Sequence, residues 1–462
     1  MSAVKSLLAV LRPPDDAPAP RGMDRPAIAA VVLALGIAPL LALLITDRAS
    51  MVALGVAALG VGLFLLSRPH LVMYLLVGGT IFNRFFVDAG FALLGAGDLA
   101  VLVVLPVWMA RRVFYPTDWQ IPRGWPLLAA YMAISAASLV LGTDPAAGQT
   151  AYVREVTYVA ALLAGVDLTR DTARLRSLFV LMCWCGLLLV VHAILTWPGG
   201  RMEGLIGQPN GLAFILSFCL WPTLGLAMSA PPSLGRMFYF GAFSLMVIGV
   251  VLTISRSNYL GLGFAGLWWL RNNRRLIVLA GLIGLAIGAV LAINPEATSE
   301  IFERWKLEDR SVSQRLQERD NAARAVEHSP WLGVGFGQFE QVHNEVDITS
   351  EHGRAAHNQY VALPAEVGIP GALALFGFVF VQFLALWGRG GLVQQLLPDE
   401  RWMLAVLQAL AIHQSVTLMF RNAWRQPEWT VLFFYCALVA ILGHRARRAA
   451  NAPVLPVPVE SA

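Results

Sequence analysis

Charged residues are scarce in this chain of 462 residues. They make up 14% of it, whereas 57% of the residues are hydrophobic and the mean hydropathy is +0.64. An ordinary soluble domain carries roughly a quarter charged residues. The deficit excludes a secreted domain, a coiled coil and a disordered tail, and it indicates an integral membrane protein.

Cysteine is also rare, and no block of basic residues is present. The four cysteines lie inside apolar runs, so no disulfide framework is implied: Cys183, Cys185, Cys219 and Cys436. The formal charge of +5 invites a nucleic-acid interpretation, but the positive residues stand at the ends of apolar runs and form no patch interleaved with aromatics. We therefore expect membrane lipids as partners, and no nucleic acid.

Apolar runs of about 20 residues, the length at which a helix crosses a bilayer, follow one another along the chain. The candidates lie near 26–46, 50–66, 70–87, 91–110, 125–141, 152–168, 177–197, 210–228, 237–254, 258–270, 276–293, 358–387, 402–420 and 429–443. They predict an all-α fold, a polytopic integral membrane bundle of 12 to 14 transmembrane helices with one long loop.

Lys and Arg in the links between these runs predict the orientation, because positive residues are retained on the cytoplasmic side. Most of them fall on the side of the N-terminus, so both termini are predicted to be cytoplasmic and the long loop to be periplasmic at a bacterial inner membrane. The expected parts are a cytoplasmic arm (1–25), a transmembrane bundle (26–293), a periplasmic loop with an amphipathic helix (294–356), C-terminal transmembrane helices (357–443) and a cytoplasmic tail (444–462).

Arg256 lies between a full-length run and the run 258–270. At about 1.5 Å per residue, that second run is too short to cross the hydrocarbon layer. We therefore expect a hairpin tip sunk below the membrane surface, with Arg256 in a protein-lined cavity where it meets a carboxylate or anionic substrate oxygens. A snorkelling or structural arginine is the alternative.

The long loop is predicted to contain a helix that begins at Ser311 and ends near Glu327. Its expected apolar side consists of Val312, Leu316, Ala323 and Val326. Arg315 and Arg319 are four residues apart and could hold a phosphate between them. The alternative is a solvated face on which these arginines pair with Glu318 or Asp320.

Gly333–Gly337 follows this helix. It lacks a preceding strand and the Gly-Lys-Ser/Thr ending of a phosphate loop, so a tight turn is predicted there.

His357 and Asn358 form the sharpest candidate site, at the point where the polar loop meets the next span. A neutral imidazole at a water-exposed helix start can accept a proton from a hydroxyl group. Together with His343 and His352, His357 could suggest a metal site, but these spacings do not stack on one helical face. No metal is predicted.

Glu366 lies nine residues after His357. A direct pair with His357 would need the kink that Pro364 and Pro370 permit. Pairing with an arginine such as Arg421 is therefore the preferred interpretation.

The order of these motifs resembles the bacterial O-antigen ligase and O-antigen polymerase superfamily. It runs from Ser255-Arg256 through Arg315 and Gly333–Gly337 to His357-Asn358, which is followed after nine residues by Gly368-Ile369-Pro370-Gly371. The turn Gly207–Asn210 before another span is similar to the same family.

The resemblance implies a metal-independent, inverting glycosyltransferase of the C type, without a cofactor, that uses glycans carried on undecaprenyl diphosphate. By this resemblance Arg256 and Arg315 hold the donor diphosphate, and His357 deprotonates or orients the acceptor hydroxyl. Further substrate-binding candidates are Arg319, Asn358, Asn210, Arg201 and Arg421.

The acceptor is left open among lipid A core (a ligase), a growing O-antigen or exopolysaccharide chain (a polymerase) and, less favoured, a protein hydroxyl. A transporter or flippase of lipid-linked sugars is the alternative from another class. Ionisable residues in the middle of the runs are few, and we expect two of them, Asp98 and His192, to be satisfied polar residues of the bundle. This distribution favours an enzyme at the periplasmic surface.

Overall fold

A computed structural model of the protein describes residues 71–82, 86–88, 93–114, 120–168, 172–272, 276–293, 310–339, 358–387, 400–420 and 428–451, with the isolated positions 65, 68 and 298–299. The expected cytoplasmic arm, the first apolar run and two candidate site residues, His357 and Arg421, lie outside these described residues.

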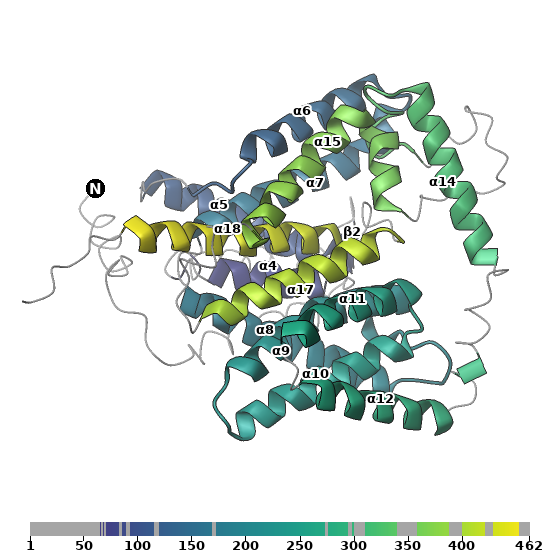
Figure 1. Ribbon diagram of the computed structural model, residues 1–462. Helices are drawn as coiled ribbons and strands as arrows, with labels where there is room; N and C mark the ends of the chain where they lie inside the picture. The colour runs from purple at the N-terminus through teal and green to yellow at the C-terminus, as the bar shows by residue number, and fades with distance from the viewer. Residues whose placement is uncertain are drawn as a thin grey trace, which may run out of the picture.

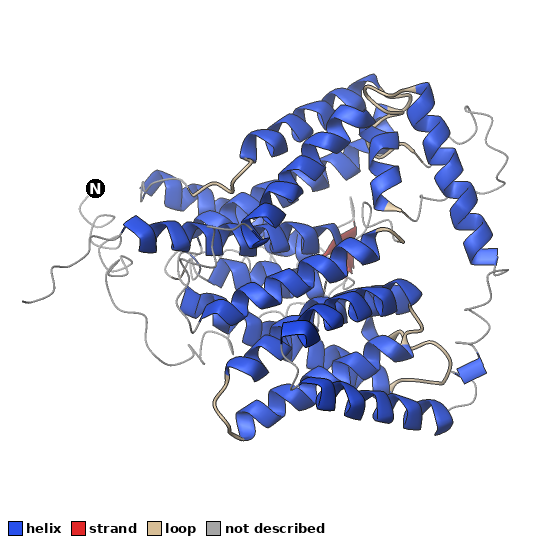
Figure 2. Cartoon of the chain, viewed as in Figure 1, coloured by secondary structure: helices blue, strands red, loops and turns tan. Residues whose placement is uncertain are grey.

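Helices make up nearly all of the regular structure that is described (Figure 2). They are α4 (Val72–Ile81), α5 (Ala96–Phe114), α6 (Trp125–Leu141), α7 (Pro145–Leu168), α8 (Thr172–Leu195), the 3-10 turn η2 (Gly204–Ile206), α9 (Pro209–Ser229), α10 (Leu234–Leu252), α11 (Arg256–Asn272), α12 (Leu276–Ile293), α14 (Arg310–His328), α15 (Gln359–Trp387), α17 (Arg401–Leu418) and α18 (Glu428–Asn451).

Four of the described helices are long and apolar enough to cross a membrane: Leu175–Leu195 of α8, α9, α10 and α15. Three shorter apolar helices accompany them: α4, α6 and the segment Ala96–Ala110 of α5. The protein is thus a helical membrane protein, and its number of spans stays a prediction.

One short antiparallel ribbon interrupts the helical pattern. Strand β1 (Phe86–Asp88) pairs with β2 (Leu93–Gly95), with Val87 opposite Leu94. The predicted helical runs 70–87 and 91–110 are therefore wrong at these residues, since α4 ends at Ile81 and α5 begins at Ala96. An apolar stretch as short as Phe85-Phe86-Val87 carries no period that separates a helix from a strand.

Helix α9 forms the centre of the core. Almost every residue of it is buried, among them Phe214, Phe218 and Trp221, because α8, α10 and α17 pack around it. Figure 1 shows these helices running in similar directions, with α14 standing across one end of the bundle, at the right of the view. We call this end the α14 end.

Helix α15 is broken once, at Gly368, whose φ of 71° and ψ of 173° are not helical. The sequence places a kink here through Pro364 and Pro370, and the non-helical residue lies between them. The first segment packs on α14 and the second on α6, so the chain turns sharply at Gly368 (Figure 1).

Candidate functional site

Arg256 is the first residue of α11 and follows an unusual turn at the α14 end. Ile254 has φ 53°, in the left-handed region that a β-branched residue rarely adopts. The turn is fixed by its own bonds, because the Ile254 N–H donates to the Val251 carbonyl (3.0 Å) and the Thr253 N–H to the Gly249 carbonyl (3.2 Å). Such strain persists only where the surroundings enforce it, so this turn holds Arg256 in a defined place.

Arg201 and Asn210 help to hold this turn in place. The Arg201 Nε donates to the Thr253 carbonyl (3.1 Å), and its Nη2 donates to Asn210 Oδ1 (2.9 Å). The backbone N–H of Met202 also donates to the Leu252 carbonyl (3.0 Å). The structure thus brings three predicted site residues, Arg201, Asn210 and Arg256, to one turn, although Arg201 and Asn210 precede Arg256 by a whole helical hairpin.

A buried chain of polar side chains supports the start of α11 from behind. Trp221 donates its indole N–H to His413 Nδ1 (3.2 Å), which leaves the proton of the neutral imidazole on Nε2, 3.3 Å from Asn258 Oδ1. Asn258 in turn donates through Nδ2 to Ser255 Oγ (3.0 Å). All of these side chains are buried.

Sequence reasoning missed this chain, since Asn258 and His413 are 155 residues apart. The sequence offers one sign of this chain, namely that Asn258 and His413 are polar residues inside apolar runs.

Helix α14 covers the segment for which the sequence predicts a helix, but its buried side differs from the predicted one. Leu316 is 49% exposed, whereas Ala322 and Ala325 are fully buried together with the polar Glu318 and Asn321. The prediction is wrong for Leu316 and Ala323, because α14 packs small residues against α15 and there Ala322 and Ala325 meet Ala362 and Ala365. It is right for Val326, which packs against the same cluster, and the Val312 side chain lies outside the described residues.

The predicted pair of arginines on α14 is only partly described. Arg315 lies in the helix, and its side chain is outside the described residues. Arg319 binds its neighbour Asp320, with Nη2 and Oδ1 3.0 Å apart, and both side chains are more than half exposed. This contact is the one expected if the arginines lie on a solvated face, which is the alternative to a phosphate site.

The segment Gly333–Gly337 is bound to the kink of α15. The Val334 N–H donates to the Ala365 carbonyl (2.9 Å), the Gly335 N–H to the Glu366 carbonyl (3.3 Å), and the Ile369 N–H to the Pro330 carbonyl (2.8 Å). The backbones approach so closely that a Cβ on Gly368 would lie 2.3 Å from the Trp331 carbonyl carbon. This segment is therefore a structural turn, as its sequence predicts, and it joins two of the motifs that carry the resemblance.

Glu366 stabilises the same joint. Its carboxylate accepts the Gly337 N–H (3.1 Å), and its carbonyl accepts the Ser138 hydroxyl of α6 (2.7 Å). The expected partner Arg421 is outside the described residues, so that pairing stays a prediction.

Asn358 caps the start of α15. Its Oδ1 accepts the Tyr360 N–H (3.0 Å), and its carbonyl accepts the Ala362 N–H (2.9 Å). Tyr360 then donates its hydroxyl to the Ser415 carbonyl near the end of α17 (3.2 Å). His357 directly precedes this cap.

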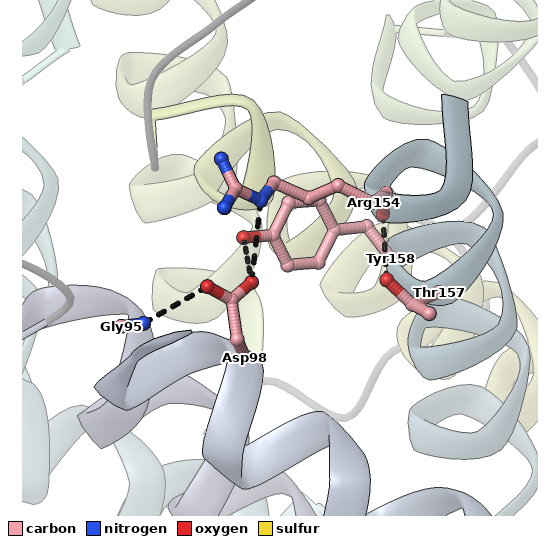
Figure 3. A network of polar contacts seen from close by, with 5 residues as sticks. All are labelled: Gly95, Asp98, Arg154, Thr157 and Tyr158. Atoms are coloured by element: carbon pink, nitrogen blue, oxygen red, sulfur yellow. Dashed lines mark hydrogen bonds and ion pairs between the residues drawn. The ribbon is translucent and has the colours of Figure 1, made fainter. Parts of the chain in front are cut away.

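Asp98 forms a separate polar network with residues of β2 and α7 (Figure 3). Its carboxylate accepts the Gly95 N–H (2.9 Å) and the Tyr158 hydroxyl (2.9 Å), and it lies 3.6 Å from Arg154 Nε. This confirms that Asp98 is a satisfied polar residue. For His192 the expectation is wrong at one atom, because its buried Nδ1 has no hydrogen-bond partner among the described residues.

The described residues contain no group of three or more His, Cys, Asp or Glu side chains that could hold a metal ion.

These observations define a polytopic helical membrane protein with a fixed arginine-bearing turn and a glycine-rich joint at one end. Residues 241–376 match the model of a family described as O-antigen ligase. The match runs from α10 into α15, and it confirms the resemblance to the O-antigen ligase and polymerase superfamily. It supports a ligase- or polymerase-type role in general. A comparison with curated proteins finds no significant match.

The matched segment contains five of the eight candidate site residues: Arg256, Arg315, Arg319, His357 and Asn358. Arg201, Asn210 and Arg421 lie outside it.

Proposed function

We propose that the protein transfers a glycan from undecaprenyl diphosphate to an acceptor hydroxyl at the periplasmic face of a bacterial inner membrane. The acceptor is lipid A core in a ligase, or a growing O-antigen or exopolysaccharide chain in a polymerase. The observation that carries the proposal is the family match over 241–376, within which Arg256 begins α11 and Asn358 caps the start of α15.

The proposed reaction is a direct displacement. The acceptor oxygen forms a bond to the anomeric carbon, while the bond from that carbon to the diphosphate oxygen breaks, which inverts the anomeric configuration. The acceptor proton passes to His357, and the electron pair of the broken bond leaves on undecaprenyl diphosphate. Because negative charge grows on the leaving group, arginines held in place before the reaction stabilise the transition state.

Arg256 and Arg315 are assigned to that leaving group. Arg256 suits the role because its turn is held by Arg201 and by the Asn258–His413 pair, so little reorganisation is needed when the diphosphate arrives. The N-terminus of α11 adds the partial positive charge of the helix dipole. Arg201, Asn210, Arg319, Asn358 and Arg421 are assigned to substrate binding.

The test uses purified wild type and His357→Ala in detergent, with an undecaprenyl-diphosphate glycan and either lipid A core or no second acceptor. His328→Ala, at the exposed end of α14, is the matched control. We expect a larger lipid-linked product from wild type and from His328→Ala, and none from His357→Ala. A product that requires lipid A core identifies a ligase, and a lengthened donor glycan identifies a polymerase.

Two results contradict the proposal. Equal product from His357→Ala removes the assigned base, and absence of product from wild type with a verified donor removes the transferase and leaves the transporter of lipid-linked sugars.

A further inference from the structure

An apolar groove lies among α9, α10, α11 and α12, with a volume of about 580 Å³. We call it the α11 groove, because α11 lines it from Tyr259 to Leu270, which is about 16 Å at the helical rise. Its other walls include Trp221, Val247 and Gly284. No charged side chain lines it, so it suits hydrocarbon and no sugar.

The open space arises from glycine. A Cβ added to Gly263, Gly266 or Gly284 would meet no atom within 4 Å. Elsewhere in the same bundle, glycines are in close contact, as at Gly261, where a Cβ would lie 2.6 Å from His413 Cδ2. The α11 groove is therefore a space beside packed helices, and it lies on the side of α11 that does not touch α17.

Arg256 begins the helix that lines this groove, three residues before Tyr259. Positions seven and eleven residues apart on an α-helix point in nearly the same direction, so Arg256 shares one stripe of α11 with Gly263 and Leu267. Helical side chains also lean toward the N-terminus, which directs Arg256 to the α14 end. A cation and a helix N-terminus at the mouth of a hydrocarbon-lined groove fit an anionic headgroup on a long apolar chain.

A second apolar groove, of about 480 Å³, lies between α15 and α17. Its polar end carries the uncharged Gln359, Tyr360, Gln414 and Ser415. Among the described residues, no charged side chain lines this polar end, whereas the helix that lines the α11 groove begins with Arg256.

We propose that the α11 groove binds the polyprenyl chain of the diphosphate donor, with the diphosphate at Arg256. This inference rests on the proposed function, because it gives a binding site to the donor of that reaction. Gly263 and Gly266 are then specificity residues, since their missing side chains leave the room that the chain occupies.

The glycines provide the test. Gly266→Leu fills the groove without meeting another atom at Cβ, and leucine is a better helix former than glycine. Gly241→Leu on α10 is the matched control, because its Cβ also meets nothing within 4 Å and it does not line the groove. We expect Gly266→Leu to raise the KM for an undecaprenyl donor by about tenfold, the effect of losing burial for two or so methylene groups. A geranyl donor, whose two prenyl units end short of Gly266, should be used equally well by both variants and wild type.

A donor with a diazirine on its prenyl chain gives a readout that does not need turnover. We expect labelling of peptides from α11 or α12, competed by unlabelled undecaprenyl diphosphate and not by phosphatidylglycerol, and lost in Gly266→Leu. Equal competition by phosphatidylglycerol, labelling elsewhere, or equal donor KM in the two glycine variants would overturn the inference. If this labelling occurs while wild type transfers no glycan, the groove assignment stands and the proposed transferase falls.

Discussion

Two parts of the α14 end are built in different ways. The turn before α11 belongs to the main bundle: Arg201 holds its backbone, and the buried Trp221–His413–Asn258 chain holds the helix behind it. The part formed by α14, Gly333–Gly337 and the first segment of α15 has a small hydrophobic cluster of its own, made of Ala322, Ala325, Val334, Phe339, Ala362 and Ala365.

The arginine turn is rigidly supported within the bundle, whereas the α14 part is attached to it at a joint. The arginine turn is fixed from several helices at once, as preorganised stabilisation of developing charge requires. The α14 part is joined to the bundle at the Gly368 kink through backbone bonds and Glu366. The two arginines proposed for the donor diphosphate thus come one from each part, Arg256 from the turn and Arg315 from α14.

The largest effect is expected at Arg256. Arg256→Ala should lower kcat/KM for transfer by about a hundredfold or more, because removal of one fixed donor to a developing anion costs that much. Arg236→Ala is the control at the opposite end of the same hairpin, where Arg236 lies over the Phe240 ring. Comparable rates in the two variants, with equal thermal stability, would show that the arginine turn has no special part in the chemistry.

Gly368→Ala should break the joint between the two parts. The new Cβ would lie 2.3 Å from the Trp331 carbonyl carbon, and φ is positive, so we expect a loss of about 3 kcal/mol or more in stability. Thermal unfolding in detergent measures it, and limited proteolysis should show cleavage between α14 and α15. Gly241→Ala serves as control because its Cβ meets nothing within 4 Å. An unchanged melting temperature would mean that the kink is not required.

His413→Leu should weaken the support of the arginine turn. It leaves the Trp221 indole N–H and the Asn258 Oδ1 without their hydrogen-bond partner. Each buried unsatisfied group costs about 1–3 kcal/mol of stability. We also expect a higher donor KM, since Asn258 holds Ser255 next to Arg256. Gln408→Leu, which removes one partly buried bond to the Leu386 carbonyl of α15, should cost less and leave the donor KM unchanged. Equal effects on KM would disconnect His413 from the turn.

The smallest effect is expected at Asn358, in the part formed by α14, Gly333–Gly337 and the first segment of α15. Asn358→Ala removes a helix cap and should cost about 1 kcal/mol, while Asn358→Ser should restore most of it. Melting temperatures of the two variants provide the measurement. If alanine is as stable as wild type, the side chain is kept for substrate and not for the start of α15.

The sequence predicts the helical class well and the local breaks poorly. Apolar runs mark α8, α9, α10 and α15 because a membrane helix is apolar all round over about 20 residues. The same property hides the ribbon, because Phe86, Val87, Leu93 and Leu94 are as apolar as residues of the neighbouring helices. The buried side of α14 was missed because alanine and polar residues, and not Leu316, face α15.

The candidate site was predictable where a residue type is unusual for its place. Arg201 and Arg256 are arginines at the ends of apolar runs, and Asn210 belongs to a turn that resembles the family; the structure joins all three at one turn. The supporting contact of His413 with Asn258 depends on which helices become neighbours. A single sequence does not encode that adjacency in any local pattern.

The most direct test of the account is formation of a new glycosidic bond in detergent solution, where no two compartments exist and transport leaves no trace. Wild type is mixed with a defined undecaprenyl-diphosphate glycan and acceptor, and the product is analysed by mass spectrometry and by the configuration of the new linkage. The account predicts a joined glycan with inverted configuration and release of undecaprenyl diphosphate, both lost in Arg256→Ala and kept in Arg236→Ala. Unchanged donor and acceptor after incubation with folded wild type and a verified donor would contradict it.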